Sequence, residues 1–202
     1  PDMSGVARGK ILPAEKYYQD KGLRLPEGIF LQTITGDAPD DYYDVISAAD
    51  GDIVLRPDLD TICLVPWATE PTAQIIHDCY TRDGRAHDLA PRNVLRRVLA
   101  LYEGLALKPV VAPELEFFLV QKNTDPDFPL LPPAGRSGRP ETARQSYSID
   151  AVNEFDPILD LMYDYCEAME LDVDTLIHES GAAQLEVNFT HDDALSRADQ
   201  VF

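Results

Sequence analysis

The chain has 202 residues, a formal net charge of −19 at pH 7 and 45% hydrophobic residues. Such an acidic protein is not expected to bind nucleic acid, because that function needs a basic surface. No apolar run reaches membrane-spanning length, so no membrane contact is expected either. Three cysteines without metal-ligand spacing are typical of a reducing compartment, and we expect a cytoplasmic protein. This length allows one large or two small domains.

Short strand candidates separated by turns fill the first part of the sequence. The clearest candidates are residues 29–34, 52–55, 61–65 and 72–80. One helix is predicted over residues 13–21, where Pro13 occupies a first-turn position that tolerates proline. Residues 37–44 are acidic and rich in turn formers, which indicates a loop. We therefore predict a small, mainly-β domain over residues 1–88 and an α/β domain over residues 89–202.

The second part combines helices with apolar strands. Residues 90–107 and 155–169 carry apolar side chains at helical spacing, which predicts two helices. Residues 110–120 and 171–177 are predicted strands. Between them, residues 123–145 hold five prolines and two glycines, which indicates a long loop. Three arginines there invite a phosphate-binding interpretation, but a solvated insertion is preferred; they are Arg136, Arg139 and Arg144.

Two carboxylates stand two positions apart in the apolar strand over residues 110–120. Side chains alternate along a strand, so Glu114 and Glu116 share one face, whereas Leu115 and Phe117 share the other. Burying two like charges side by side is costly unless a positive charge lies between them. A hard divalent cation is the expected partner. The alternative is a solvated pair on a half-exposed strand.

A second acidic element surrounds a turn of small residues. We predict a hairpin with Gly181 in its turn, so that Glu179 ends one strand and Glu186 lies on the next. Gln184 shares the face of Glu186. Four glutamates without a Cys/His set favour Mg²⁺ or Mn²⁺ over zinc. Their charge of about −4 predicts two divalent ions.

These segments resemble the glutamine synthetase family. Residues 114–119 are similar to its Glu-x-Glu-Phe-Phe-Leu strand, and residues 178–186 to its His-Glu-x-Gly-x-x-Gln-x-Glu segment. Residues 5–10 resemble its opening Gly-x-x-Arg-Gly-Lys. The branch most similar to the chain joins glutamate to polyamines such as putrescine. One departure is Ala182-Ala183, where many members carry proline and glycine.

The resemblance implies an α+β fold, with a β-grasp-like N-terminal domain followed by the start of a catalytic domain with an antiparallel sheet. It implies an ATP-dependent ligase that forms a γ-glutamyl amide from glutamate and a polyamine or ammonia, through γ-glutamyl phosphate. Glu116, Glu179 and Glu186 would hold one ion beside glutamate, and Glu114 would help hold a second beside ATP. The sequence does not indicate which amine is used.

The resemblance also implies roles for two further residues and for the assembly. Asp37 would receive the amine across a subunit boundary, and His191 would stack on adenine. Family members are considerably longer and form rings of identical subunits. We therefore expect the chain to be an N-terminal portion that is inactive alone, with Phe117 or Phe189 left uncovered. Two alternatives stay open: a non-catalytic structural or binding member, and a guanidino-type kinase on a related fold.

Overall fold

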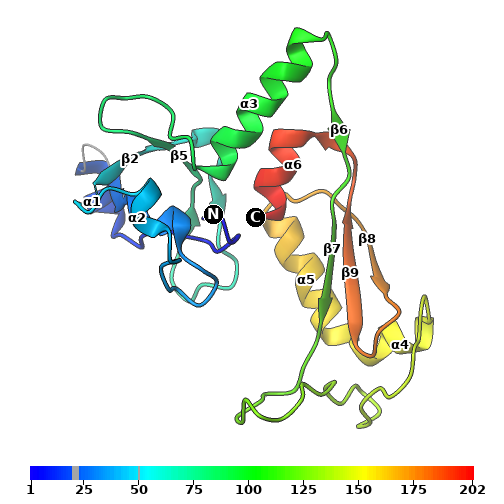
Figure 1. Ribbon diagram of the computed structural model, residues 1–202. Helices are drawn as coiled ribbons and strands as arrows, with labels where there is room; N and C mark the ends of the chain where they lie inside the picture. Colours follow the sequence, from blue (N-terminus) through cyan, green and yellow to red (C-terminus); the bar gives the residue numbers. More distant parts are fainter. Residues whose placement is uncertain (20–22, 50) are drawn as a thin grey trace. The chain divides into compact units, whose positions relative to one another are not determined.

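The computed structural model describes residues 1–19, 23–49 and 51–202 (Figure 1). The chain divides into two compact units. The first comprises Pro1–Ile62, Ala73–Pro109 and Phe202, and the second comprises Cys63–Thr72 and Val110–Val201. Helices and antiparallel strands occur in the chain together, as the α+β prediction requires. These compact units do not coincide with the two domains predicted over residues 1–88 and 89–202, and that domain boundary stays a prediction.

A three-stranded antiparallel sheet in the order β1-β2-β5 forms the centre of the first unit. Its strands are β1 (Leu23–Pro26), β2 (Asp52–Pro57) and β5 (His77–Tyr80). Alternation along β2 buries Ile53 and Leu55, which pack with Phe30 and Ala90. Each large aliphatic side chain buried in this way stabilises the fold by about 1.5–3 kcal/mol. The strand predicted over residues 52–55 is thereby confirmed.

Helices and one short strand complete the first unit. They are α1 (Ala14–Gln19), the 3-10 helix η1 (Glu27–Leu31), α2 (Tyr42–Val45), the 3-10 helix η2 (Leu59–Thr61), β4 (Ala73–Gln74) and α3 (Pro91–Gly104). The helix predicted over residues 90–107 is confirmed as α3. The helix predicted over residues 13–21 is seen as α1, and its positions 20 and 21 lie outside the described residues.

The strand predicted over residues 29–34 is wrong. Residues 27–31 form η1 instead, in which Gly28 and Phe30 are buried. Phe30 contributes its ring to the core around β2 from this helical turn, so burial outweighs the strand preference of a short apolar run. The strand predicted over residues 72–80 is present as two shorter strands, β4 and β5.

A second antiparallel sheet, in the order β7-β9-β8, forms the centre of the second unit (Figure 1). Its strands are β7 (Glu114–Phe118), β8 (Val173–His178) and β9 (Gln184–Phe189). β9 is central and pairs with both neighbours. The predicted hairpin is confirmed, because β8 and β9 pair directly and residues 179–183 form the turn between them.

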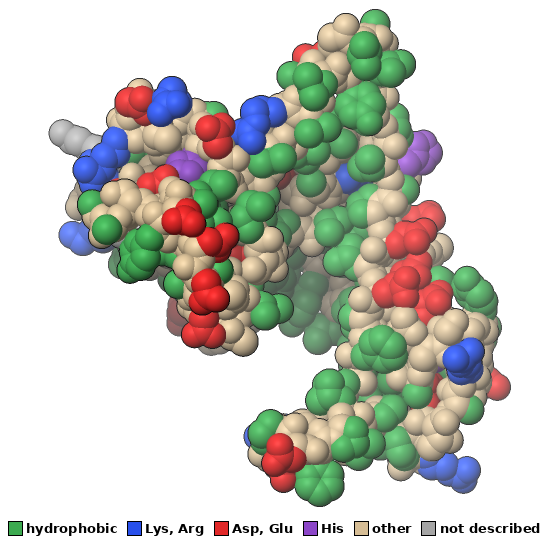
Figure 2. All heavy atoms as spheres, viewed as in Figure 1, with side chains coloured by type: hydrophobic (Ala, Val, Ile, Leu, Met, Phe, Trp, Pro, Cys, Tyr) green, Lys and Arg blue, Asp and Glu red, His purple; other side chains and the backbone are tan. Residues whose placement is uncertain are grey.

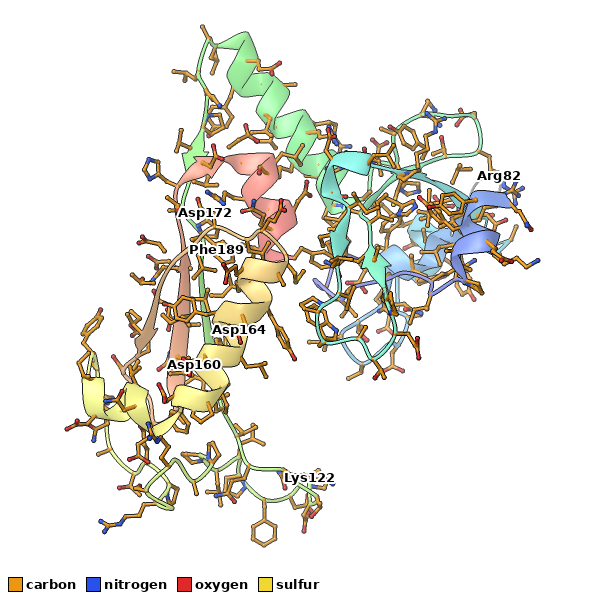
Figure 3. All side chains as sticks on the ribbon, turned by 180° about the vertical axis from the view of Figure 1, so that it is seen from behind. Arg82, Lys122, Asp160, Asp164, Asp172 and Phe189 are labelled. Carbon is orange, nitrogen blue, oxygen red and sulfur yellow. The ribbon has the colours of Figure 1, made fainter. Side chains whose placement is uncertain are left out.

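One face of this sheet packs against helix α5 (Asp156–Ala168), which follows α4 (Ile149–Glu154). The shared core is Phe117, Leu119, Val152, Phe155, Leu159, Met162, Leu176, Ala183 and Leu185. Asp160 and Asp164 lie on the exposed side of α5 (Figure 3). The expectation that Phe117 or Phe189 would be uncovered is wrong. Phe117 packs in this core and Phe189 is buried, because both belong to the apolar faces of their strands.

Short elements complete the second unit. They are β3 (Cys63–Leu64), β6 (Val110–Val111), β10 (Asp192–Asp193) and α6 (Ala194–Val201). β10 pairs with β6. Arg197 of α6 is buried and donates to Asp172 at 2.9 Å. None of the helices in the described part of the chain is both long and apolar enough to cross a membrane.

Candidate metal centre

Three glutamate carboxylates converge on the sheet face opposite α5. One oxygen each of Glu116, Glu179 and Glu186 lies within 4.8 Å of the others. The register explains this convergence, because Glu116 lies directly opposite Glu186 in the β7–β9 ladder. Glu179 comes immediately after β8, the other neighbour of β9. Acidic side chains gather over these strands (Figure 2).

Glu186 is the buried member of this group, with only 6% of its surface exposed. Burial is the largest cause of a raised pKa at Glu186, and the carboxylates of Glu114, Glu179 and Glu116 raise it further. A hydrogen bond with Asn188 acts in the opposite direction. Glu114 lies opposite Asn188, on the same face as Glu116 but outside the group of three.

Within the described ranges, no lysine, arginine or histidine forms an ion pair with these four glutamates. The arginines of the second unit that form ion pairs do so elsewhere, Arg136 with Asp156 and Arg197 with Asp172. Like charges placed directly opposite each other on paired strands destabilise a sheet. Ionised carboxylates offer only acceptor oxygens. The donor set therefore fits a hard divalent cation such as Mg²⁺ or Mn²⁺.

Gln184, the first residue of β9, links the turn between β8 and β9 to the glutamate group. Its Nε2 donates to Glu116 at 2.7 Å, and its Oε1 accepts from the backbone N–H of Gly181 at 2.7 Å. A Cβ at position 181 would lie 2.5 Å from the Phe118 ring, so the tight turn favours glycine. The sequence places Gln184 on the correct face but gives no signal for its hydrogen bond to Glu116.

The two other predicted site residues do not belong to the glutamate group. Asp37 lies in the first unit, where its carboxylate accepts from Thr35 Oγ1 at 2.8 Å and its backbone N–H donates to Thr33 at 3.0 Å. His191 is exposed between β9 and β10. Their proposed contacts with an amine and with adenine stay predictions.

Sequence reasoning missed Glu141 entirely. This residue belongs to the proline-rich loop, where no periodicity marks a functional position. In the structure its carboxylate contacts His178 and the backbone of Ala183, at the two ends of the turn that carries Glu179.

Comparison with known proteins identifies the family. The model of the glutamine synthetase catalytic domain matches residues 88–202. Gamma-glutamylputrescine synthetase PuuA of Escherichia coli is 31% identical over 206 residues, an alignment that covers 98% of this chain and 42% of that enzyme. Glutamate–isopropylamine ligase of a Pseudomonas species is also 31% identical over 206 residues, with 98% and 43% covered. The chain therefore belongs to the glutamine synthetase family.

Solved structures agree with this assignment. The structure described as apo GmaS without ligand has a TM-score of 0.75 and 25% identity, covering 99% of this chain and 43% of its own. A crystal structure of a glutamine synthase homologue has a TM-score of 0.77 at 19% identity, which shows a common fold. The chain thus spans about two-fifths of the length of the relatives it matches, 42% for the Escherichia coli enzyme.

Proposed function

We propose that a protein containing this chain is an ATP-dependent ligase that joins glutamate to an amine as a γ-glutamyl amide. The observation that carries the proposal is the convergence of Glu116, Glu179 and Glu186 within 4.8 Å, in a chain of the glutamine synthetase family. Relatives named for gamma-glutamylputrescine and for glutamate–isopropylamine support glutamate as one substrate and an amine as the other. The net charge of −19 is compatible with a cationic amine.

The glutamates would form the metal-binding part of the site. Glu116, Glu179 and Glu186 would hold one Mg²⁺ or Mn²⁺ beside glutamate, and Glu114 would help hold a second beside ATP. When bound, such ions neutralise the charge of the triphosphate and of the transferring phosphoryl group. The register of β7 and β9 keeps Glu116 opposite Glu186, and Gln184 orients the Glu116 carboxylate.

The reaction we propose has two steps. The γ-carboxylate of glutamate attacks the terminal phosphate of ATP, which gives γ-glutamyl phosphate and ADP. The amine nitrogen then attacks the acyl carbon, phosphate leaves, and the nitrogen loses a proton. Asp37 is proposed to attract the cationic amine and to accept that proton, and His191 to stack on adenine. The same proposal includes a β-grasp-like domain over residues 1–88 and a catalytic domain from residue 89. It also includes assembly into a homo-oligomeric ring and a cytoplasmic location.

Glutamate-dependent ADP release tests the ligase. The assay uses a protein of the relatives' length that contains this chain, with ammonia, putrescine, longer polyamines and monoamines as acceptors. ADP release that requires both glutamate and an amine supports the proposal. A guanidino-type kinase would instead turn over ATP with a guanidino acceptor and without glutamate. A non-catalytic member would show no turnover, and either result would overturn the proposal. The 202-residue chain by itself is predicted to form no γ-glutamyl amide.

A further inference from the structure

A buried histidine–glutamate pair lies behind the turn that carries Glu179. The side chain of His178 is completely buried, and that of Glu141 is 10% exposed. Nε2 of His178 lies 3.1 and 2.9 Å from the two carboxylate oxygens of Glu141. Nδ1 of the same ring lies 2.8 Å from the backbone carbonyl oxygen of Glu179. The ring therefore connects the loop residue Glu141 to the backbone of a proposed metal ligand.

The same Glu141 carboxylate also contacts the other end of the turn. Its Oε2 accepts from the backbone N–H of Ala183 at 2.6 Å. Ala183 is fully buried and has a left-handed backbone with φ of 55°, a conformation that costs an alanine about 1 kcal/mol. Its carbonyl oxygen accepts from the N–H of Leu119 at 2.9 Å. Glu141 thus connects the start of the turn, through His178, with its end, just before Gln184.

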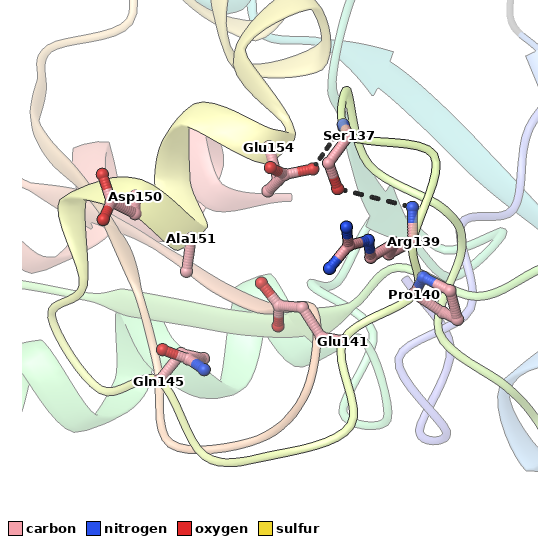
Figure 4. Close-up of a pocket in the computed structure, with 8 residues that line it drawn as sticks. All are labelled: Ser137, Arg139, Pro140, Glu141, Gln145, Asp150, Ala151 and Glu154. Carbon is pink, nitrogen blue, oxygen red and sulfur yellow. Dashed lines mark hydrogen bonds between the residues drawn. The ribbon is translucent and has the colours of Figure 1, made fainter.

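The loop that carries Glu141 is attached to this turn at further points. The N–H of Tyr147 donates to the carbonyl oxygen of His178 at 2.9 Å, and Ser146 Oγ donates to Ser180 Oγ at 3.1 Å. Glu141 lines a pocket with Arg139, Glu154 and neighbouring loop residues (Figure 4). The preferred interpretation of residues 123–145 as a solvated insertion is therefore wrong at Glu141, because its carboxylate contacts two residues in or beside the sheet, His178 and Ala183.

We propose that Glu141 and His178 are positioning residues that fix the turn over residues 179–183, so that the Glu179 carboxylate faces Glu116 and Glu186. This inference rests on the proposed metal site. Groups that orient metal ligands typically change metal affinity by about 10–100-fold. Here the orientation acts through the backbone of the turn, so we expect the lower end of that range.

A Mn²⁺ titration of the 202-residue chain, by calorimetry or electron paramagnetic resonance, tests this role. Glu141→Ala should raise the dissociation constant about tenfold. Glu141→Gln keeps an acceptor for the Ala183 N–H and a partner for His178, so it should stay within about threefold of wild type. Glu154→Gln is the matched control, because Glu154 lines the same pocket and accepts from Ser137 N–H at 2.9 Å. It should bind Mn²⁺ like the wild type.

Circular dichroism and thermal unfolding show whether each variant is folded. If Glu141→Ala does not fold, Glu141→Asp replaces it, because the shorter side chain cannot reach both His178 and Ala183 and should lose affinity about tenfold. A folded Glu141→Ala or Glu141→Asp variant that binds Mn²⁺ as tightly as wild type would overturn the inference and leave the metal site intact. A wild-type chain that binds no Mn²⁺, or binds it equally well after Glu186→Gln, would overturn the metal site and this inference with it.

Discussion

The two units of the chain differ in what surrounds their clustered carboxylates. In the first unit, Arg92 lies 2.7 Å from Asp58 and 2.5 Å from Asp78. Arg96 adds weaker contacts with the same two residues, at 3.4 and 3.2 Å. The hydrogen bond from Arg92 is the largest cause of a lowered pKa at Asp58. Arginines of the chain itself therefore neutralise this pair.

In the second unit, the carboxylates of Glu116, Glu179 and Glu186 meet without such a partner among the residues the structure describes. Burial and the neighbouring carboxylates raise the pKa of Glu186, opposite in direction to Asp58. Acidic clustering alone therefore does not mark a metal site, since the Asp58–Asp78 pair is neutralised by arginine. What distinguishes the glutamates is that none of the basic side chains the structure describes pairs with them, so we propose that a cation from outside the chain is their partner.

Arg92→Ala should have the largest effect on stability. It would leave Asp58 and Asp78, with side chains 24% and 15% exposed, without their main partner. Breaking a mostly buried ion pair costs about 3 kcal/mol of unfolding free energy, measured by urea denaturation. Arg97→Ala is the control, because its partner Asp88 is 83% exposed and such surface pairs contribute only about 0–1 kcal/mol. Equal losses of unfolding free energy in Arg92→Ala and Arg97→Ala would contradict a special role of Arg92 in neutralising Asp58 and Asp78.

Glu186→Gln should have the next largest effect, this time on Mn²⁺ binding. Removing the buried ligand lowers both the number of charged oxygens and the charge of the site, so affinity should fall about 100-fold. Calorimetric titration measures the change. Glu114→Gln should lower the affinity of this ion only a few-fold, because Glu114 lies outside the group of three. A larger loss in Glu114→Gln than in Glu186→Gln would reverse our assignment of the ligands.

Asp58→Asn should remove part of the pH dependence of stability. The folded pKa of Asp58 lies below its usual value of 3.8. Its contribution to stability is therefore present above pH 3.8 and is lost as pH falls through the folded pKa. Relative to wild type, the variant should lose about 1.5 kcal/mol at pH 7 and less below pH 3.8. Urea denaturation of both proteins at pH 7 and below pH 3.8 measures this change. A difference in unfolding free energy between variant and wild type that is the same at the two pH values would be inconsistent with the ion pair.

Glu186→Gln in the presence of a chelator should raise the free energy of unfolding at pH 7, whereas Asp58→Asn lowers it. This is the smallest of the expected effects. The folded pKa of Glu186 lies above its usual value of 4.5. The contribution of this carboxyl to stability is present below pH 4.5 and is lost as pH rises through the folded pKa. The metal-free variant should be more stable than wild type at pH 7, by up to about 1 kcal/mol of cross-strand repulsion. A less stable variant at pH 7 would contradict the repulsion.

Local patterns explain which parts of the site the sequence predicts. Alternation along a strand depends only on neighbouring residues, so the sequence is sufficient to place Glu114 with Glu116 and Gln184 with Glu186. Helix α3 is predictable for the same reason, since its apolar spacing and Pro91 are local features. By contrast, the contact between Glu141 and His178 joins residues 37 positions apart, and nothing in the loop sequence marks Glu141. The η1 helix is missed because the burial of Phe30 depends on the rest of the core.

The position of a bound metal ion shows whether Glu116, Glu179 and Glu186 form a metal site. Crystals of the 202-residue chain grown with Mn²⁺, measured near the manganese absorption edge, would locate the ion by its anomalous scattering. We expect one peak at about 2.0–2.6 Å from carboxylate oxygens of Glu116, Glu179 and Glu186. A manganese peak at another acidic cluster, or these three carboxylates turned away from one another around an empty centre, would contradict this expectation.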